Sequence, residues 1–329
     1  MLSMSILNHL RSKLVPGLPR SFLKNLLLPG LLVLCILLLC GCAGAGEAGK
    51  GAVDLPETSE QSGSTTPSPE EPVQSEEETL QLPILMYHHL TQEEETGGSR
   101  ISVARFRDQM RALAEAGYHP VGFDEVLAWV EDGAEIPEKP IVITFDDGYA
   151  SNYELAYPIL REYDFKATIF VIGVSVGKDT YKDTGHPIYP HFSIEQGEEM
   201  EASGLVNIQS HGYNIHEQRN LDPDPLRRGI LRREGESEED YLAFLHEDCT
   251  RMKTILGKMP IALAYPFGVY DDSADAILRE EGIRITVTTQ PGLNTLTRGE
   301  SQCLWRMNRF DCDDSMTGEM LLEKIEVVG

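Results

Sequence analysis

IVITFDDGY, residues 141–149, is a continuous apolar run that ends in two adjacent carboxylates, Asp146 and Asp147, followed by Gly148. Such a run is typical of a strand that is buried on both faces of a sheet. Neighbouring side chains diverge where a strand ends, so one carboxylate could bind a metal while the other contacts a water molecule. Asp-Gly is also a common turn sequence, but the buried strand in front of it favours a functional site over a simple turn.

Short apolar runs alternate with amphipathic stretches on both sides of this segment. We expect further strands at residues 84–87, 167–172, 206–209, 261–265 and 283–288. We expect helices at residues 106–114, 126–130, 153–163, 195–203, 241–256 and 274–281. Strands that alternate regularly with helices predict a parallel sheet or barrel that is covered by helices. The polar segment 173–191 is predicted to form a loop at one rim.

A second polar cluster, QSHGYNIH at residues 209–216, follows another predicted strand. Histidine is the commonest ligand for zinc and similar metals, although a pair of histidines alone is more often structural. His211 and His216 are five residues apart, which on one helix would separate their side chains by about 140°. They would converge only in a loop or at a helix entry. Together with Asp147 they form a candidate metal site that leaves positions open for water and substrate.

Two other predicted strand ends carry aromatic and polar residues, in AYPFG at 264–268 and MYHH at 86–89. Each signal is weak alone, because aromatic residues beside a strand usually belong to the core. Four strands would nevertheless deliver polar or aromatic groups at their carboxyl ends. In α/β barrels that rim carries the active site.

From Pro83 to about Arg309 the chain resembles the polysaccharide deacetylase family, the NodB-homology domain of carbohydrate esterases. TFDDGY at 144–149 matches the first motif of that family, and 264–268 resembles the third, with alanine where many members have arginine. The two histidines match the second motif. Their spacing is wider than in the classical form of that motif and is similar to the spacing in the branch acting on poly-β-1,6-N-acetylglucosamine. The usual late Leu-x-His motif is missing from residues 304–309, and Tyr87-His88 resembles the element that replaces it in that branch.

The resemblance implies a distorted (β/α)7 barrel that binds a divalent metal, commonly Zn²⁺, with Ni²⁺, Co²⁺ or Fe²⁺ as alternatives. The implied metal ligands are Asp147, His211 and His216. Asp146 would be the general base that activates water.

The remaining roles that the resemblance implies concern the leaving group and the sugar. His88 would be the general acid, with His89 as the neighbouring alternative, because only one of two consecutive side chains in a strand can face the site. The backbone N–H of Tyr149 would stabilise the oxyanion. Tyr265 and Phe267 would line the sugar groove, although ordinary core packing would explain these aromatic residues equally well.

The N-terminus predicts a lipoprotein signal peptide over residues 1–41, with basic residues before the apolar run 26–39. Cys42 follows small residues and would be the lipidated first residue of the mature chain. An uncleaved transmembrane anchor is the alternative, because the apolar run falls only a little short of a full span. Residues 42–82 are rich in small and acidic residues and predict a disordered linker, which leaves 83–329 as the catalytic domain. Either anchor would place that domain outside the cytoplasm.

The net charge of −25 argues against nucleic acid and against electrostatic docking on anionic lipid. Cys249, Cys303 and Cys312 follow the signal region, and a Cys303–Cys312 disulfide would suit an oxidising compartment.

These features together predict hydrolysis of N-acetyl groups from an extracellular amino-sugar polysaccharide, either poly-N-acetylglucosamine, peptidoglycan or a chitin-like polymer, with release of acetate. An O-acetyl esterase that acts on xylan or another glycan is one alternative. A carbohydrate-binding lipoprotein without catalysis is a second, and the complete Asp-Asp-His-His set argues against it. A glycoside hydrolase is disfavoured because adjacent carboxylates cannot flank a glycosidic bond. No protein partner is inferred.

Overall fold

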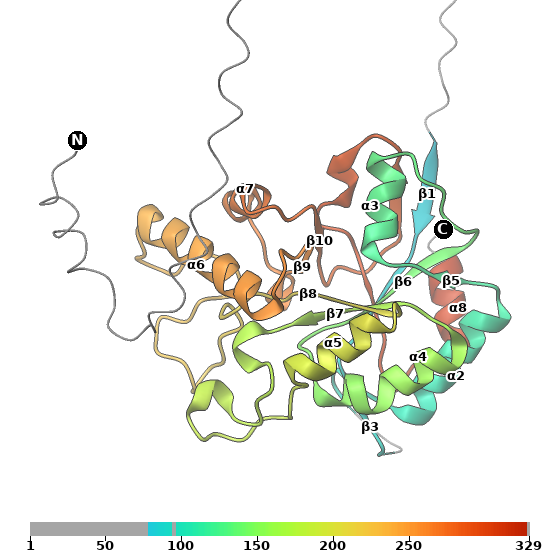
Figure 1. Ribbon diagram of the computed structural model, residues 1–329, viewed down its shortest axis with the longest axis horizontal. Coiled ribbons are helices and arrows are strands. Elements are labelled where there is room, and N and C mark those ends of the chain that lie inside the picture. The colour runs from blue at the N-terminus through green and yellow to red at the C-terminus, as the bar shows by residue number, and fades with distance from the viewer. Residues whose placement is uncertain (1–77, 94–96, 328–329) are drawn as a thin grey trace, which may run out of the picture. The chain divides into compact units, whose positions relative to one another are not determined.

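The computed structural model describes residues 78–93 and 97–327 (Figure 1). The predicted signal peptide, Cys42 and the linker up to residue 77 lie outside these ranges. Within the described residues, no helix is both long enough and apolar enough to cross a bilayer.

The centre of the fold is a parallel sheet that curls into a half-barrel, which confirms the predicted α/β barrel type. In spatial order its strands are β10 (Ile285–Val287), β9 (Ala262–Ala264), β8 (Val206–Ser210), β7 (Ala167–Val171), β6 (Pro140–Phe145), β2 (Ile84–Tyr87) and β12 (Phe310–Asp311). A short strand, β5 (His119–Pro120), also pairs with β6. The register places Tyr87 opposite Phe145 and Val171 opposite Ser210. The residues that follow these strands therefore emerge at one edge.

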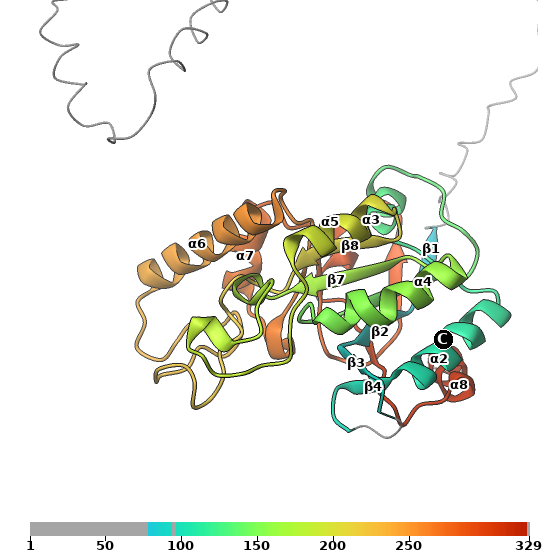
Figure 2. The ribbon, with the colours of Figure 1, turned by 60° about the horizontal axis from the view of Figure 1, so that its bottom comes forward.

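Helices cover the sheet as the alternating pattern predicts. They are α2 (Val103–Glu115), α3 (Phe123–Glu131), α4 (Tyr157–Tyr163), α5 (Ile194–Ala202), α6 (Glu238–Leu256), α7 (Asp272–Glu280) and α8 (Gly318–Val327). Helices α2 and α8 pack side by side (Figure 2). Successive residues of β6 enter two different cores, with Ile141 and Ile143 in one and Val142 in the other. This burial on both faces explains why the strand reads as a continuous apolar run.

The predicted helix over residues 153–163 is divided in two. Residues Asn152–Ala156 form a π-helical turn, and α4 follows with Pro158 in its first turn. A proline is tolerated there because the first N–H groups of a helix have no partner within the helix. Pro158 therefore marks the start of a helix and does not break one.

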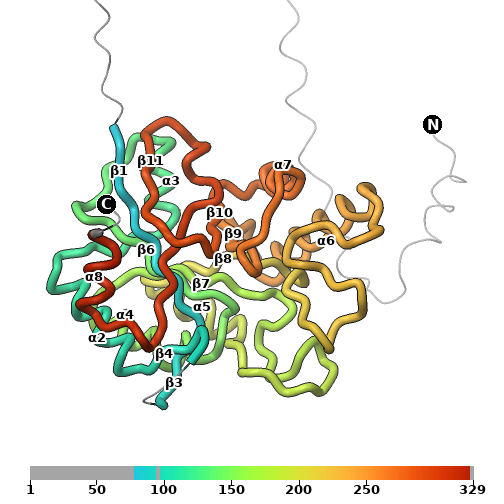
Figure 3. The backbone as a smooth tube through the Cα atoms, turned by 180° about the vertical axis from the view of Figure 1, so that it is seen from behind, coloured from blue at the N-terminus to red at the C-terminus, as the bar shows by residue number. Residues whose placement is uncertain are grey.

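The predicted linker extends too far. Strand β1 (Thr79–Leu82) pairs antiparallel with β11 (Asn294–Thr297), and the two run side by side in Figure 3. Leu82 is fully buried. These residues are ordered because they pair with a strand more than two hundred positions away along the chain. The amino-acid composition of the segment could not indicate this pairing. The folded domain thus includes residues 79–82.

A disulfide between Cys303 and Cys312, which the sequence leaves open, is not formed, and both residues are free cysteines. Each thiol lies near a different backbone carbonyl, Cys303 near that of Thr297 and Cys312 near that of Phe310. Cys312 sits inside the core beside Tyr87, where burial raises the pKa of its thiol to about 12.

Candidate active site

Asp147, His211 and His216 converge at the carboxyl ends of β6 and β8. Their potential ligand atoms all lie within 4.8 Å of one another. Oδ1 of Asp147 is 3.5 Å from Nε2 of His211 and 3.8 Å from Nε2 of His216. That oxygen is buried and accepts no hydrogen bond from the described residues. A buried carboxylate oxygen that faces two imidazole nitrogens fits a divalent metal held among the three groups.

A tight turn brings Asp147 into this position. Asp147 has φ 73° and Gly148 has φ 82°, both in the left-handed region. A Cβ at Gly148 would lie 2.8 Å from a side-chain methyl of Val171, so glycine is required there. Left-handed backbone at a non-glycine residue is uncommon and concentrates at functional sites.

The two histidines converge through a loop, as their spacing requires. Gly212 has φ 78°, and a Cβ there would collide with Ile215. The backbone N–H groups of Tyr213 and Asn214 both donate to the carboxylate of Asp248 on α6, at 2.8 and 2.7 Å. Helix α6 therefore fixes the course of the loop between the two histidines, a contact that the sequence did not reveal.

The buried ring of His211 is oriented by a backbone carbonyl. Its Nδ1 lies 2.8 Å from the oxygen of Ala264 at the end of β9, so Nδ1–H is the donor. Burial lowers the pKa of His211 and favours the neutral imidazole. Nε2 then carries the lone pair and faces Asp147, which is the tautomer that a metal ligand needs. Ala264 therefore contributes to the site through its main chain.

Asp146 is held by Arg309, a residue to which the sequence assigned no role. Nη1 and Nη2 of Arg309 each donate to one oxygen of Asp146 at 2.7 Å, and Arg309 is fully buried. The Nε of Arg309 donates to the carbonyl of Thr288 at 2.7 Å. Burial alone would raise the pKa of Asp146, but Arg309, aided by His211, holds that pKa well below its ordinary value. Asp146 is therefore a carboxylate at any neutral pH.

His88 and His89 have different surroundings. His88 acts electrostatically on both Asp146 and Asp147, helping to lower their pKa values, and its Nδ1 is buried without a partner among the described residues. Nδ1 of His89 lies 2.9 Å from Oγ of Ser151, and its ring stacks on Tyr189 with centroids 4.4 Å apart. Of the two, His88 is thus the one that lies close enough to both aspartates to lower their pKa values.

The aromatic residues separate into two groups. Phe267 is 48 % exposed, and its ring centroid lies 4.3 Å from that of His216. Tyr265 is fully buried, and its hydroxyl donates to Asp275. The prediction that Tyr265 lines a sugar groove is therefore wrong, because its partner draws the ring into the core. Trp305 is also buried, with the Arg279 guanidinium 3.5 Å from its ring.

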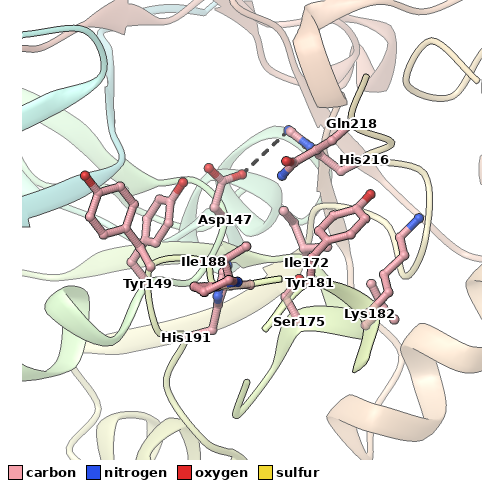
Figure 4. Close-up of a pocket in the computed structure, with 13 residues that line it drawn as sticks. Asp147, Tyr149, Ile172, Ser175, Tyr181, Lys182, Ile188, His191, His216 and Gln218 are labelled. Atoms are coloured by element: carbon pink, nitrogen blue, oxygen red, sulfur yellow. Dashed lines mark ion pairs between the residues drawn. The ribbon is translucent and has the colours of Figure 1, made fainter. Parts of the chain in front are cut away.

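A cavity of about 450 Å³ opens beside Asp147 and His216 (Figure 4). Tyr149 lines it, as expected for a residue of the first motif. Most of the wall comes from the predicted loop 173–191, which includes two short 3₁₀ turns, Gly173–Ser175 and Tyr181–Asp183. The sequence singled out none of the residues that this loop contributes, because neither periodicity nor motif marks them.

Residues 133–286 match the family model described as polysaccharide deacetylase. The chain is similar to "Putative polysaccharide deacetylase YxkH" of Bacillus subtilis, with 29% identity over 76% of this chain and 78% of that protein. It is 28% identical to the poly-beta-1,6-N-acetyl-D-glucosamine N-deacetylase of Escherichia coli over 61% of this chain, but this match spans only 32% of that longer protein. The fold resembles a de-N-acetylase from Aggregatibacter actinomycetemcomitans, with a TM-score of 0.63, 23% identity and coverage of 74% and 99%.

Proposed function

We propose that this chain, whose residues 133–286 match the polysaccharide deacetylase family model, removes N-acetyl groups from an extracellular amino-sugar polysaccharide in a metal-dependent reaction. The observation that carries this proposal is the convergence of Asp147, His211 and His216 around an unpaired, buried carboxylate oxygen. A second aspartate, kept ionised by arginine, lies next to that group. This combination suits hydrolysis of an unreactive amide.

The preferred substrate in this proposal is poly-β-1,6-N-acetylglucosamine. Relatives that carry this activity in their names align with more than half of the chain. The five-residue histidine spacing also resembles that branch. Peptidoglycan and chitin-like polymers share the N-acetyl group and are tested alongside.

Asp147, His211 and His216 would hold the metal, with Zn²⁺ as the first candidate. A bound ion of this kind polarises the acetyl oxygen and lowers the pKa of a coordinated water. Ala264 supports this role by fixing the tautomer of His211. The exposed ring of Phe267, packed on His216, would contact the sugar.

Asp146 would accept the proton of the attacking water. Arg309 occupies one lone pair on each carboxylate oxygen, so a second lone pair on each remains available. The guanidinium keeps Asp146 ionised and fixes its orientation. The backbone N–H of Tyr149 would stabilise the oxyanion, and His88 would protonate the departing amine, which is a poor leaving group without that proton.

The test is acetate release from a panel of glycans, namely β-1,6-linked N-acetylglucosamine oligomers, peptidoglycan, chitin oligomers and acetylated xylan. We expect release from the first, and release from xylan alone would instead identify an esterase. Asp147→Asn should lose bound zinc and activity together, since asparagine tolerates the left-handed backbone but is a poor metal ligand. Met320→Ala, at an exposed residue of α8, is the matched control. Full activity and stoichiometric zinc in Asp147→Asn would exclude the proposed metal site.

A further inference from the structure

The segment 173–191 is bound firmly to both motifs of the candidate site. At its start, the N–H of Gly173 donates to the carbonyl of Gly212 at 3.1 Å, and that of Val174 to the carbonyl of Tyr213 at 2.9 Å. At its end, the N–H of Ala150 donates to the carbonyl of Pro190 at 2.7 Å. The residues near position 190 therefore hold a fixed place relative to Asp147.

The cavity that this segment builds is larger than the reaction alone requires. An acetamide group has only a few heavy atoms, whereas about 450 Å³ falls within the range of pockets for whole small ligands, roughly 300–1,000 Å³. Its wall runs from Asp147 past Tyr149 and His191 to Tyr181 and Lys182 (Figure 4). Phe267 is not part of this wall, although it packs on His216, which is.

Tyr189 is an aromatic ring held at the mouth of this cavity. It is 52 % exposed, and the exposed large hydrophobic residues of the described chain are Tyr189, Phe267 and Met320. Tyr189 lines the same cavity as Asp147 and His216, and Phe267 packs on His216. The ring of Tyr189 stacks on His89 and meets Tyr149 edge-on, with centroids 6.2 Å apart. Its neighbours therefore fix the ring plane while half of its surface faces solvent.

His191 adds a polar group to the same wall. Its ring packs on Tyr149 with centroids 5.1 Å apart, and its Nδ1 has no hydrogen-bond partner among the described residues. Burial lowers the pKa of His191, although the nearby Asp147 opposes this. A neutral imidazole offers one donor and one acceptor nitrogen, which suits sugar hydroxyl and amide groups.

We propose that Tyr189 and His191 form a second carbohydrate subsite, which binds the sugar unit next to the one that is deacetylated. The proposal rests on the proposed function, since it presumes a glycan substrate. The apolar C–H face of the neighbouring pyranose lies against the ring of Tyr189, and His191 hydrogen-bonds a polar substituent of that unit. The pocket thereby makes the enzyme prefer oligomers over a single sugar.

The test compares acetate release from N-acetylglucosamine and from its β-1,6-linked oligomers of two to five units. Tyr189→Ala should raise KM for the oligomers by about 3–10-fold, the usual worth of an aromatic contact, and should flatten the dependence on length. His191→Phe keeps the packing on Tyr149 and should also raise KM, with a smaller effect on kcat. An activated acetyl ester, which carries no neighbouring sugar, should be affected much less in both variants.

Tyr189→Phe retains the ring and should restore the preference for oligomers, which separates stacking from a general structural loss. Met320→Ala is the control for removing an exposed apolar side chain. If Tyr189→Ala and His191→Phe showed the length dependence of the wild type, the subsite would be refuted while the deacetylase activity stood. If the wild type released acetate from none of the glycans, the proposed function itself would fail, and the subsite with it.

Discussion

Asp146 and Arg309 are buried together, and each depends on the charge of the other. A carboxylate without a partner at 2 % exposure would carry a large desolvation cost, and so would the guanidinium. The segment 304–309, which lacks the Leu-x-His sequence that the resemblance led us to expect, ends in the arginine that neutralises Asp146. Arg309 also donates a hydrogen bond to the hydroxyl of Thr144 at 3.1 Å.

Replacing this arginine should therefore affect stability as well as activity. We expect Arg309→Met to destabilise the protein by about 3–5 kcal/mol at pH 7, because Asp146 would remain buried without a counter-charge. The pKa of Asp146 is depressed in the folded state, so the pair stabilises wild type above about pH 4 and loses this effect as the pH falls through the folded-state pKa. Urea denaturation should thus show the full difference in unfolding free energy between wild type and Arg309→Met at pH 7. This difference should shrink as the solution becomes acidic.

The double variant Asp146→Asn/Arg309→Met is the control for this prediction. It removes both charges and should regain much of the lost stability without regaining activity. Arg309→Lys keeps the charge but not the paired hydrogen bonds and should be intermediate. Equal stability of Arg309→Met and wild type at pH 7 would contradict the role of the pair.

His88 is the residue whose proposed role is tested by the choice of leaving group. His88→Ala should lower amide hydrolysis by about 10²–10⁴-fold, the usual worth of a general acid. An activated acetyl ester should lose far less, since its leaving group departs without a proton. His119→Ala, at an exposed histidine of β5, is the control. Equal losses of activity on the amide and the ester would contradict the assignment of His88 as the general acid. His89 would then be the next residue to test.

At the scale of elements, α6 controls the loop that carries the metal ligands. Asp248 accepts two consecutive N–H groups of that loop and is buried. Asp248→Ala would leave both donors without their partner and should weaken zinc binding about 10-fold or more, as loss of supporting hydrogen bonds around metal sites does. Zinc titration against a competing chelator measures this directly, and unchanged affinity would show that the loop holds its shape without α6.

The same carboxyl gives a pH dependence of opposite sign to that of Asp146. Burial raises the pKa of Asp248 to about 6, although the two N–H donors favour the charged form. Because the folded-state pKa lies above the unfolded value, the stability from this group is full below about pH 4 and is lost as the pH rises through about 6. Wild type should therefore lose stability relative to Asp248→Asn between pH 4 and pH 7. A constant difference across that range would refute the raised pKa.

Strand β1 is the first strand of the described residues. Leu82 is fully buried, and burying a leucine contributes about 1.5–3 kcal/mol. A chain that starts at Pro83 should therefore be at least about 2 kcal/mol less stable than one that starts at Glu78, and β11 would become an open edge. Denaturant unfolding of the two chains checks this. Matching midpoints would mean that β1 adds nothing to the fold.

On the scale of the whole molecule, the sheet collects short motifs that are far apart in the sequence. The parallel register brings the residues after β2, β6 and β8 to one edge, where Asp147, His211 and His216 from two motifs converge. The segment 173–191 then supplies most of the cavity wall. The chemistry of the site and its proposed preference for long substrates are thus set by different parts of the chain.

Anchoring is a property of the whole chain, and it is proposed from the sequence alone. If Cys42 is lipidated, Cys42→Ser should move the protein from the detergent-rich to the aqueous phase or leave an unprocessed precursor. Acetate release by the soluble protein should be unchanged, because residue 42 lies outside the catalytic domain. Membrane partitioning equal to that of wild type, with product of the correct size, would rule out lipidation at this position.

The sequence by itself determined six strands of the central sheet, most helices, the parallel α/β class and the three potential metal ligands, because these depend on local periodicity and on short motifs. Only the tertiary structure decided that Arg309 pairs with Asp146, 163 positions away, that Tyr265 turns into the core, and that β1 is ordered. It also decided that Tyr189 and His191 flank the cavity. Such contacts depend on which surfaces pack together after folding, and one sequence carries no periodic signal for a partner that is distant along the chain.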